Sequence, residues 1–198
     1  MLDYLKFGYE KRPKLVHRID KATSGILVLA RSQDITIKLT DAFKKTLIDK
    51  IYWAIVIGRP EKKIGVIDAS LIKQTGKYFD KMEVDFDIGK KSLTQYRVIS
   101  GVSKKFTWIE LSPKTGRTHQ LRAHCSFIGT PILGDNKYGG RLMSLKNMNK
   151  DELFLLARGI RINLSDIKKN IFYAPLPKHM KDAFEYLGFK ESEGQSFD

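Results

Sequence analysis

The segment His17–Gly25 places charged and hydroxyl side chains directly before an apolar, β-branched run that is typical of a buried strand. Asp20 therefore falls in a loop at the edge of the predicted core, where a rigid element can hold functional side chains in place. A carboxylate held in this way is a candidate catalytic group. The alternative is purely structural, an Asx-type turn in which Asp20 and Thr23 bind the local backbone.

The segment Pro113–His124 combines a glycine-bearing turn with the start of a helix that Thr118 is predicted to cap. Free N–H groups at the start of such a helix form an anion site, and Arg117 and His119 would lie beside it. Arg122 lies one turn into the helix next to its apolar stripe, so we expect it to have a buried carboxylate partner. The alternative is a solvated basic helix face with a histidine in the core.

The sequence predicts neither a metal site nor an organic cofactor. Cys125 is the single cysteine and lies on an apolar stripe, so it is interpreted as a core residue rather than a nucleophile. His119 and His124 are five positions apart and do not share a helix face, as a pair of zinc ligands would. The chain also lacks a phosphate-binding loop of the G-x-x-x-x-G-K-[ST] type.

Hydrophobic periodicity predicts the elements that would hold these segments in place. Strands are expected at Gly25–Ala30, Ile51–Ile57, Leu93–Ser100 and Phe106–Leu111, with the last two forming a hairpin, and a strand or strand pair is expected at Glu152–Leu164. Helices are expected from Ser32 to Leu47, from Thr118 to Ile128, and after Pro177 as far as Leu187, where Gly188 would end the last one. Because strands and helices mix without regular β-α-β alternation, we predict the α+β class.

The charge points to a polyanionic partner. The 198 residues include 36 Lys or Arg and 22 Asp or Glu, which gives a net charge of +14 and a pI of about 9.7. Nucleic acid is the expected partner, and an inert basic surface is the alternative. No apolar run approaches the ~20 residues that cross a bilayer, and the start lacks a signal peptide's apolar core, so we expect no membrane partner and a cytoplasmic location.

Three blocks, in order, resemble the RluA-type pseudouridine synthases. His17–Gly25 resembles the family signature H-R-L-D-x-x-T-S-G, and Lys50–Ala54 resembles its short tyrosine-bearing strand. Thr115–Arg122 resembles a later family motif, which Pro131–Asp135 continues. The resemblance covers most of the chain and implies a catalytic domain over residues 1–190, built on a mixed, largely antiparallel sheet flanked by helices. Residues 191–198 are then a polar tail that we expect to be frayed.

The resemblance also implies residue roles. It makes Asp20 the catalytic nucleophile, places Tyr52 against the target base, and pairs Arg122 with Asp20. Arg18 would fill the gap left by a flipped nucleotide. The further substrate-binding residues implied by these motifs are Thr23, Arg117, His119 and Gln120. The family needs no metal or cofactor.

The implied substrate is RNA, with large-subunit ribosomal RNA favoured by the spacing and by the C-terminal stretch. Transfer RNA is one alternative, and an inactive RNA-binding remnant is another, because only 16 residues precede His17 and the family's N-terminal portion is expected to be missing. A monomer is expected. A positive surface around both motifs would include Lys114, Arg117, Lys137 and Arg141.

Overall fold

The computed structural model describes residues 2–6, 8, 10–74, 81–140, 152–164, 170–194 and 197. Arg141, which the sequence predicts to extend the positive surface, lies outside the described residues.

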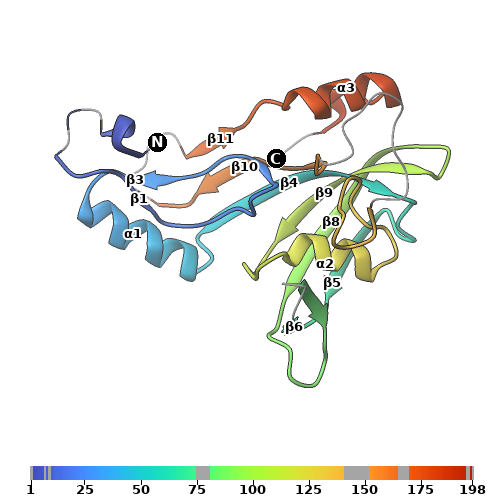
Figure 1. Cartoon of the computed structure of the whole chain (residues 1–198), viewed down its shortest axis with the longest axis horizontal. Coiled ribbons are helices and arrows are strands. Elements are labelled where there is room, and N and C mark those ends of the chain that lie inside the picture. The colour runs from blue at the N-terminus through green and yellow to red at the C-terminus, as the bar shows by residue number, and fades with distance from the viewer. Residues whose placement is uncertain are drawn as a thin grey trace.

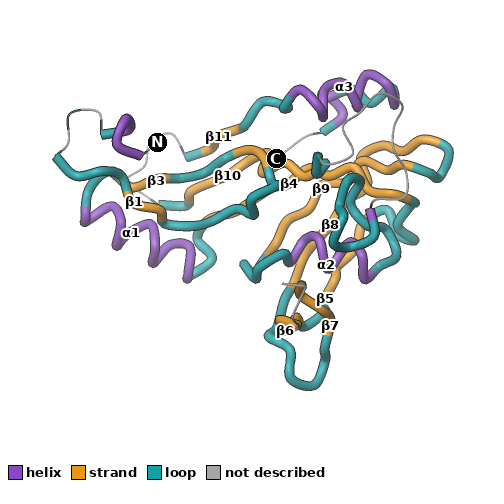
Figure 2. The backbone as a smooth tube through the Cα atoms, in the orientation of Figure 1, coloured by secondary structure: helices purple, strands orange, loops and turns teal. Residues whose placement is uncertain are grey.

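One seven-stranded sheet crosses the molecule (Figures 1 and 2). Its strands are β2 (Ser24–Gly25), β4 (Ile48–Ile57), β5 (Ile64–Asp68), β8 (Leu93–Val102), β9 (Phe106–Pro113), β10 (Leu155–Ile162) and β11 (Ile171–Tyr173). They lie in the order β11, β10, β4, β9, β8, β5, with β2 added beside β10. Among these described strands every pairing is antiparallel except that of β2 with β10.

Smaller elements complete the fold. Two further strand pairs are β1 (Lys14–Leu15) with β3 (Leu29–Ala30), and β6 (Leu71–Gln74) with β7 (Lys81–Val84). The helices are α1 (Gln33–Lys44), α2 (Gln120–Phe127) and α3 (Lys178–Leu187), with single 3₁₀ turns η1 (Leu2–Leu5) and η3 (Glu191–Glu193). The predicted α+β class, with a mixed and largely antiparallel sheet flanked by helices, is confirmed.

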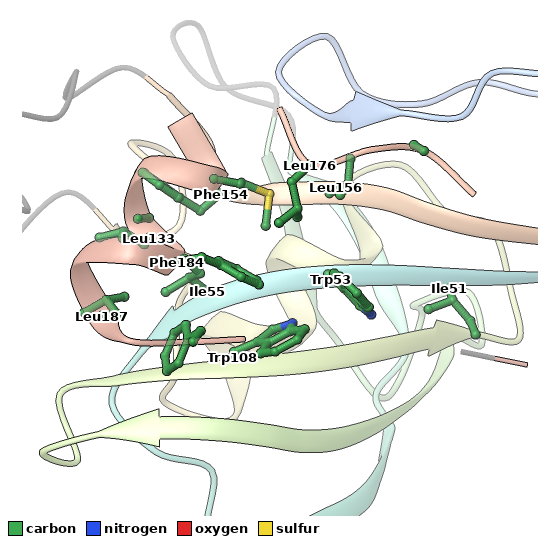
Figure 3. Close-up of a cluster of buried hydrophobic side chains, with 14 residues drawn as sticks. Ile51, Trp53, Ile55, Trp108, Leu133, Phe154, Leu156, Leu176, Phe184 and Leu187 are labelled. Carbon is green, nitrogen blue, oxygen red and sulfur yellow. The ribbon is translucent and has the colours of Figure 1, made fainter. Parts of the chain in front are cut away.

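The face of the sheet under α3 carries the aromatic core. Trp53 and Ile55 of β4 point to this side and pack with Trp108 of β9 and Phe184 of α3 (Figure 3). The Trp108 and Phe184 ring centroids lie 4.6 Å apart. Large buried aromatic side chains contribute more than any other residue type to a core of this size, so this layer fixes the position of the central strands.

The opposite face of β4 lies between α1 and α2 (Figure 1). Ile48, at the start of β4, shares a buried cluster with Leu39 of α1, and Val56, near its end, shares one with Leu121 of α2. Side chains alternate along a strand, so the even-numbered residues between them, including Tyr52, point to this same face. This alternation directs the central part of β4 into the space between the two helices.

Several predicted elements are confirmed. Ser32 caps α1, and its hydroxyl oxygen accepts the N–H of Ile35 at 3.3 Å. The predicted hairpin is β8 and β9, and α3 ends at Gly188, which has a φ of +71°. Cys125 is fully buried in the core, as predicted, and burial raises the pKa of its thiol.

Two predicted elements differ from the structure. The single strand predicted at Gly25–Ala30 is divided into β2, which pairs with β10, and β3, which pairs with β1. Gly25 has a φ of +111° and lies so close to the Ala157 backbone that no side chain would fit. The helix predicted to begin at Thr118 begins at Gln120, with His119 at the N-cap in the left-handed region at a φ of +50°.

The C-terminal residues are not frayed where the structure describes them. Glu191 forms an ion pair with Arg158 of β10 at 2.8 Å. Gly194 lies against the indole rings of the aromatic core, and the Phe197 ring packs on Tyr173 at a centroid distance of 5.9 Å. The expectation of a frayed tail is therefore wrong for these residues, because aromatic contacts hold them to the sheet.

Candidate active site

A pocket of about 720 Å³ opens on the face of β4 between α1 and α2. Its walls come from the loop before β2, the end of α1, the middle of β4 and the turn that follows β9. Among its described lining residues Asp20 is the one carboxylate. The cationic lining residues are Arg18, Lys44, Lys50, Lys114 and Arg117. The two sequence segments singled out for chemistry thus meet in one cationic cavity.

Asp20 lies in a tight turn immediately before β2. The Thr23 N–H donates to the Asp20 carbonyl oxygen at 2.9 Å, and parallel pairing of β2 with β10 anchors the end of this turn. The Asp20 side chain is partly buried, and its carboxylate accepts no hydrogen bond from a described residue. Both oxygens are therefore available to a molecule bound in the pocket.

His17 anchors the start of the same loop. Its Nε2 accepts the Val28 N–H at 2.8 Å, and its ring stacks on Phe43 of α1 at a centroid distance of 4.5 Å. Burial, together with the nearby charge of Lys50, lowers the pKa of His17 to about 4. The imidazole is thus neutral near pH 7, as an acceptor nitrogen requires. The sequence contains His17 in its motif but gives no sign of this anchoring role.

Tyr52 forms part of the pocket wall next to Leu121 and Leu155. Burial and the negative charge of Asp20 raise the pKa of its phenol to about 12. The phenol is therefore protonated at neutral pH, and it can offer an aromatic face and one O–H donor to a bound base. Tyr52 and Asp20 thus line the same pocket within electrostatic range of each other, and contact of Tyr52 with the target base stays a prediction.

Arg122 has a different partner from the one predicted. Its Nε and Nη2 donate to the two carboxylate oxygens of Asp135, each at 2.7 Å, and both side chains are buried. The expected buried carboxylate is confirmed, but pairing with Asp20 is wrong, since no described hydrogen bond or ion pair joins the two. Asp20 still acts on Arg122 at longer range, because its charge contributes to the raised pKa of the guanidinium.

The turn after Asp135 orients this carboxylate for its ion pair with Arg122. One Asp135 oxygen also accepts the N–H groups of Lys137 and Tyr138, at 3.0 and 3.1 Å. The carboxylate thus accepts several hydrogen bonds in a fixed orientation, as a buried charge requires. Asp135 ends the block Pro131–Asp135, but neither its role nor that of Tyr138 was predicted from the sequence.

Tyr138 and His119 extend this network toward Asp20. The Tyr138 hydroxyl accepts the Met82 N–H at 2.8 Å and lies 3.2 Å from His119 Nδ1. The Tyr138 oxygen accepts from Met82, and the tautomer of the His119 ring decides whether the hydroxyl or Nδ1 donates in the second contact. Burial lowers the pKa of His119, although the charge of Asp20 opposes this.

Gln120 is a structural residue rather than a substrate ligand. Its amide oxygen accepts from the Thr115 hydroxyl and the Arg117 N–H, at 2.7 and 3.0 Å. Its amide nitrogen donates to Leu93 O and Thr94 Oγ1, both at 3.0 Å. All four hydrogen-bonding positions of the amide are used. The prediction that this amide binds substrate is therefore wrong, and Gln120 instead holds the turn that lines the pocket.

The remaining predicted residues differ in position. Arg18 and Arg117 are exposed and line the pocket, with Arg117 Nε donating to Lys91 O at 3.3 Å. Thr23 is buried at the rim. His119 lies within electrostatic range of Asp20, as its pKa shows. Direct substrate contact by these four residues stays a prediction.

Comparison with known proteins defines the class to which this fold and pocket belong. Residues 2–127 match the family model described as RNA pseudouridylate synthase, so the chain belongs to that family. The human protein described as RNA Pseudouridylate Synthase Domain Containing 4 shares the fold, with a TM-score of 0.76 and 28% identity over 94% of this chain and 80% of that one. The human protein described as RNA Pseudouridylate Synthase Domain Containing 1 also shares the fold, with a TM-score of 0.66 at 22% identity.

Two curated relatives show the extent of the similarity. Ribosomal large subunit pseudouridine synthase C of Rickettsia typhi is 40% identical over 80% of this chain and 51% of its own length. An uncharacterized RNA pseudouridine synthase of Zymomonas mobilis is 39% identical over 93% of this chain and 81% of its own length. The chain thus spans about half the length of the Rickettsia relative and most of the Zymomonas one.

None of the helices in the described part of the chain has the length and apolar character needed to cross a membrane. No group of three or more His, Cys, Asp or Glu side chains within the described ranges is arranged to hold a metal ion.

Proposed function

We propose that this chain isomerises uridine to pseudouridine in RNA, with Asp20 as the catalytic carboxylate. The observation that carries the proposal is Asp20 itself, a carboxylate without a described hydrogen bond in a pocket that it shares with Tyr52 and with five Lys and Arg residues. Membership of the RNA pseudouridylate synthase family supports the same reaction.

The reaction needs a carboxylate at the sugar. The N1–C1′ bond breaks, C5 bonds to C1′, a proton leaves C5 and a proton is taken up at N1. In one route an Asp20 oxygen bonds to C1′ while the uracil leaves with the bonding electron pair, and C5 of the turned uracil later displaces the carboxylate. In the other route Asp20 removes the C2′ proton while the uracil leaves C1′ with the bonding electron pair, which gives a glycal; C5 of the turned uracil then bonds to C1′ as the proton returns to C2′. Both routes require Asp20 to be ionised and unobstructed.

Tyr52 and Arg122 have supporting roles in this proposal. Tyr52 offers uracil a surface for stacking, and its protonated hydroxyl is a hydrogen-bond donor rather than a base, given its pKa of about 12. Arg122 is a positioning residue: its bond to Asp135 fixes a positive charge within electrostatic range of Asp20. This arrangement keeps the positive charge near Asp20 without occupying either of its carboxylate oxygens.

Large-subunit ribosomal RNA is the proposed substrate. The support comes from the names of relatives, which include Ribosomal large subunit pseudouridine synthase C of Rickettsia typhi and synthase D of Borreliella burgdorferi, the latter at 38% identity. The net charge of +14 favours a polyanion of any kind. A monomeric state and a cytoplasmic location stay predictions.

The test is a chemical map of pseudouridine in ribosomal and transfer RNA from a deletion strain and from the same strain complemented with the gene. The expected result is that defined uridines of large-subunit RNA lose the modification on deletion and regain it on complementation. An identical map in both strains would overturn the proposal. Loss confined to transfer RNA would retain the reaction and replace the substrate.

A further inference from the structure

The pocket contains a second cluster of charge, separate from Asp20, that no catalytic role accounts for. Lys50 of β4 and Lys114 of the turn after β9 both line it, and neither forms an ion pair or hydrogen bond with a described residue. We infer that Lys50 and Lys114 form a subsite for a backbone phosphate of RNA adjacent to the target uridine. This inference rests on the proposed function and names a contact within the same site.

Strand geometry separates Lys50 from Tyr52 by a distance similar to that between the base and the phosphate of a nucleotide. Lys50 and Tyr52 are two residues apart in β4, so their side chains leave the same face about 6.5 Å apart along the strand. A nucleotide presents its base and its phosphate on opposite sides of the ribose at a comparable separation. A base lying on Tyr52 would therefore direct one of its flanking phosphates toward Lys50.

The turn after β9 passes close to the Lys50 ammonium group. Strand β9 pairs with β4 as far as Tyr52 and Leu111, and the chain then turns through Lys114 and Gly116. A Cβ atom placed on Gly116 would lie 4.0 Å from Lys50 Nζ. Gly116 is exposed and has no side chain, so the turn leaves the ammonium group open to a ligand from the pocket.

The charges around Lys50 favour an anion. Burial and the nearby positive charge of Lys114 lower the pKa of Lys50, and only Asp49 opposes them among the charges found to act on it. Asp49, however, is engaged by Arg161 at 2.9 Å and by Asn163 at 3.1 Å. Two ammonium groups that share a partly desolvated site repel each other, and a bound phosphate would relieve this repulsion.

The first test measures RNA affinity without turnover. Binding of a fluorescein-labelled oligouridylate is followed by anisotropy at several salt concentrations for the wild type, Lys50→Gln, Lys50→Arg and Lys105→Gln. Lys105 is the matched control, because it is exposed in the turn between β8 and β9 and does not line the pocket.

For Lys50→Gln we expect about tenfold weaker binding, the size of one charge-assisted hydrogen bond, and a salt slope shallower by about 0.7. Lys50→Arg keeps the charge and should retain most of the affinity, and Lys105→Gln should match the wild type. The inference is overturned if Lys50→Gln loses no more affinity or salt dependence than Lys105→Gln.

A second measurement follows binding in the wild-type chain, and a conservative variant is needed only to assign one resonance. Lysine side chains are labelled by reductive ¹³C-methylation, which retains their charge, and the Lys50 resonance is assigned by its absence from Lys50→Arg. It should shift on addition of uridine 5′-monophosphate or uridine 3′-monophosphate, but not with uridine. A Lys50 resonance that neither nucleotide moves, or that uridine moves equally, contradicts the subsite.

The two proposals can fail separately. RNA binding that depends on Lys50, in a chain whose deletion leaves the pseudouridine map unchanged, would retain the phosphate subsite and overturn the isomerase. If complementation restores the modification but Lys50→Gln binds RNA as tightly as the wild type, the isomerase proposal stands and the phosphate subsite is overturned.

Discussion

Arg122 and Asp135 form a buried, bidentate ion pair whose two hydrogen bonds measure 2.7 Å each, and this pair lies beside Asp20 without bonding to it. The arrangement separates two tasks. Asp135 satisfies the guanidinium and fixes its position, while Asp20 keeps both oxygens free for the pocket. A direct Arg122–Asp20 bond would instead occupy the carboxylate that the proposed chemistry needs.

Breaking this pair should strongly destabilise the fold. Arg122→Ala leaves Asp135 as an uncompensated buried charge, so we expect the free energy of unfolding to fall by about 3–5 kcal/mol. Urea denaturation measures the change. The control is Lys45→Ala, which breaks the exposed Lys45–Asp41 pair and should cost less than about 1 kcal/mol.

A double variant identifies the cause of the loss. Arg122→Met combined with Asp135→Asn removes both charges. The double variant should therefore lower the free energy of unfolding by less than the sum of the decreases caused by the two single variants. Equal costs for Arg122→Ala and Lys45→Ala would show that the buried pair is not important for stability.

Gln120 should affect stability even in the absence of RNA. Gln120→Met keeps a side chain of similar size but removes all four hydrogen bonds of the amide, so that the Arg117 N–H loses its acceptor and Leu93 O and Thr94 Oγ1 each lose one partner. We expect a loss of about 1–3 kcal/mol in urea denaturation of the free protein. A variant with wild-type stability and weakened RNA binding would restore the original prediction that Gln120 contacts the substrate.

His17 should make stability depend on pH. The folded protein keeps the imidazole neutral down to about pH 4, whereas the unfolded chain takes up a proton near the ordinary pKa of 6.5. Protonation therefore favours unfolding, and the free energy of unfolding should fall by about 1–3 kcal/mol as the pH drops through this window.

His17→Gln isolates this contribution from those of the other histidines. Its side-chain oxygen can still accept the Val28 N–H, but it does not titrate. The difference between the urea-denaturation curves of variant and wild type should shrink below about pH 6.5. A difference that stays constant with pH would mean that His17 is not held neutral.

Tyr52 should contribute no inflection to the pH dependence of activity at ordinary pH. Its pKa of about 12 keeps the phenol protonated, so ionisation of Tyr52 cannot limit the rate between about pH 6 and pH 9. The measurement compares the initial rate against pH for the wild type and Tyr52→Phe, which retains the stacking face. An alkaline inflection in this range that disappears in Tyr52→Phe would contradict the assignment.

The sequence predicted those features that depend on local patterns. Ser32 is followed by apolar residues at helical spacing, and the segment Ile51–Ile57 is apolar and β-branched. Gly188 follows the last apolar residue of α3. The helix α1, the strand β4 and the end of α3 were all predicted on these grounds. The segments that contain Asp20 and Arg117 line one pocket. The motif resemblance predicted that they would meet, whereas hydrophobic periodicity did not.

The errors concern contacts between distant segments. Asp135 captures Arg122 because a tight turn orients its carboxylate with the N–H groups of Lys137 and Tyr138, and no hydrophobic pattern reports such a turn. The partners of Gln120 come from β8 and from the turn after β9, so its structural role becomes visible only in the folded chain. These contacts decide which polar residues remain available to a ligand.

Asp20→Asn tests the central claim most directly. Purified wild type, Asp20→Asn and the exposed control Asp34→Asn are each incubated with RNA carrying the mapped uridine, and pseudouridine formation and RNA affinity are both measured. We predict that Asp20→Asn abolishes pseudouridine formation and changes RNA affinity by less than about tenfold, because phosphate contacts supply most of the binding, while Asp34→Asn behaves as wild type. Pseudouridine formation by Asp20→Asn at the wild-type rate would contradict the account.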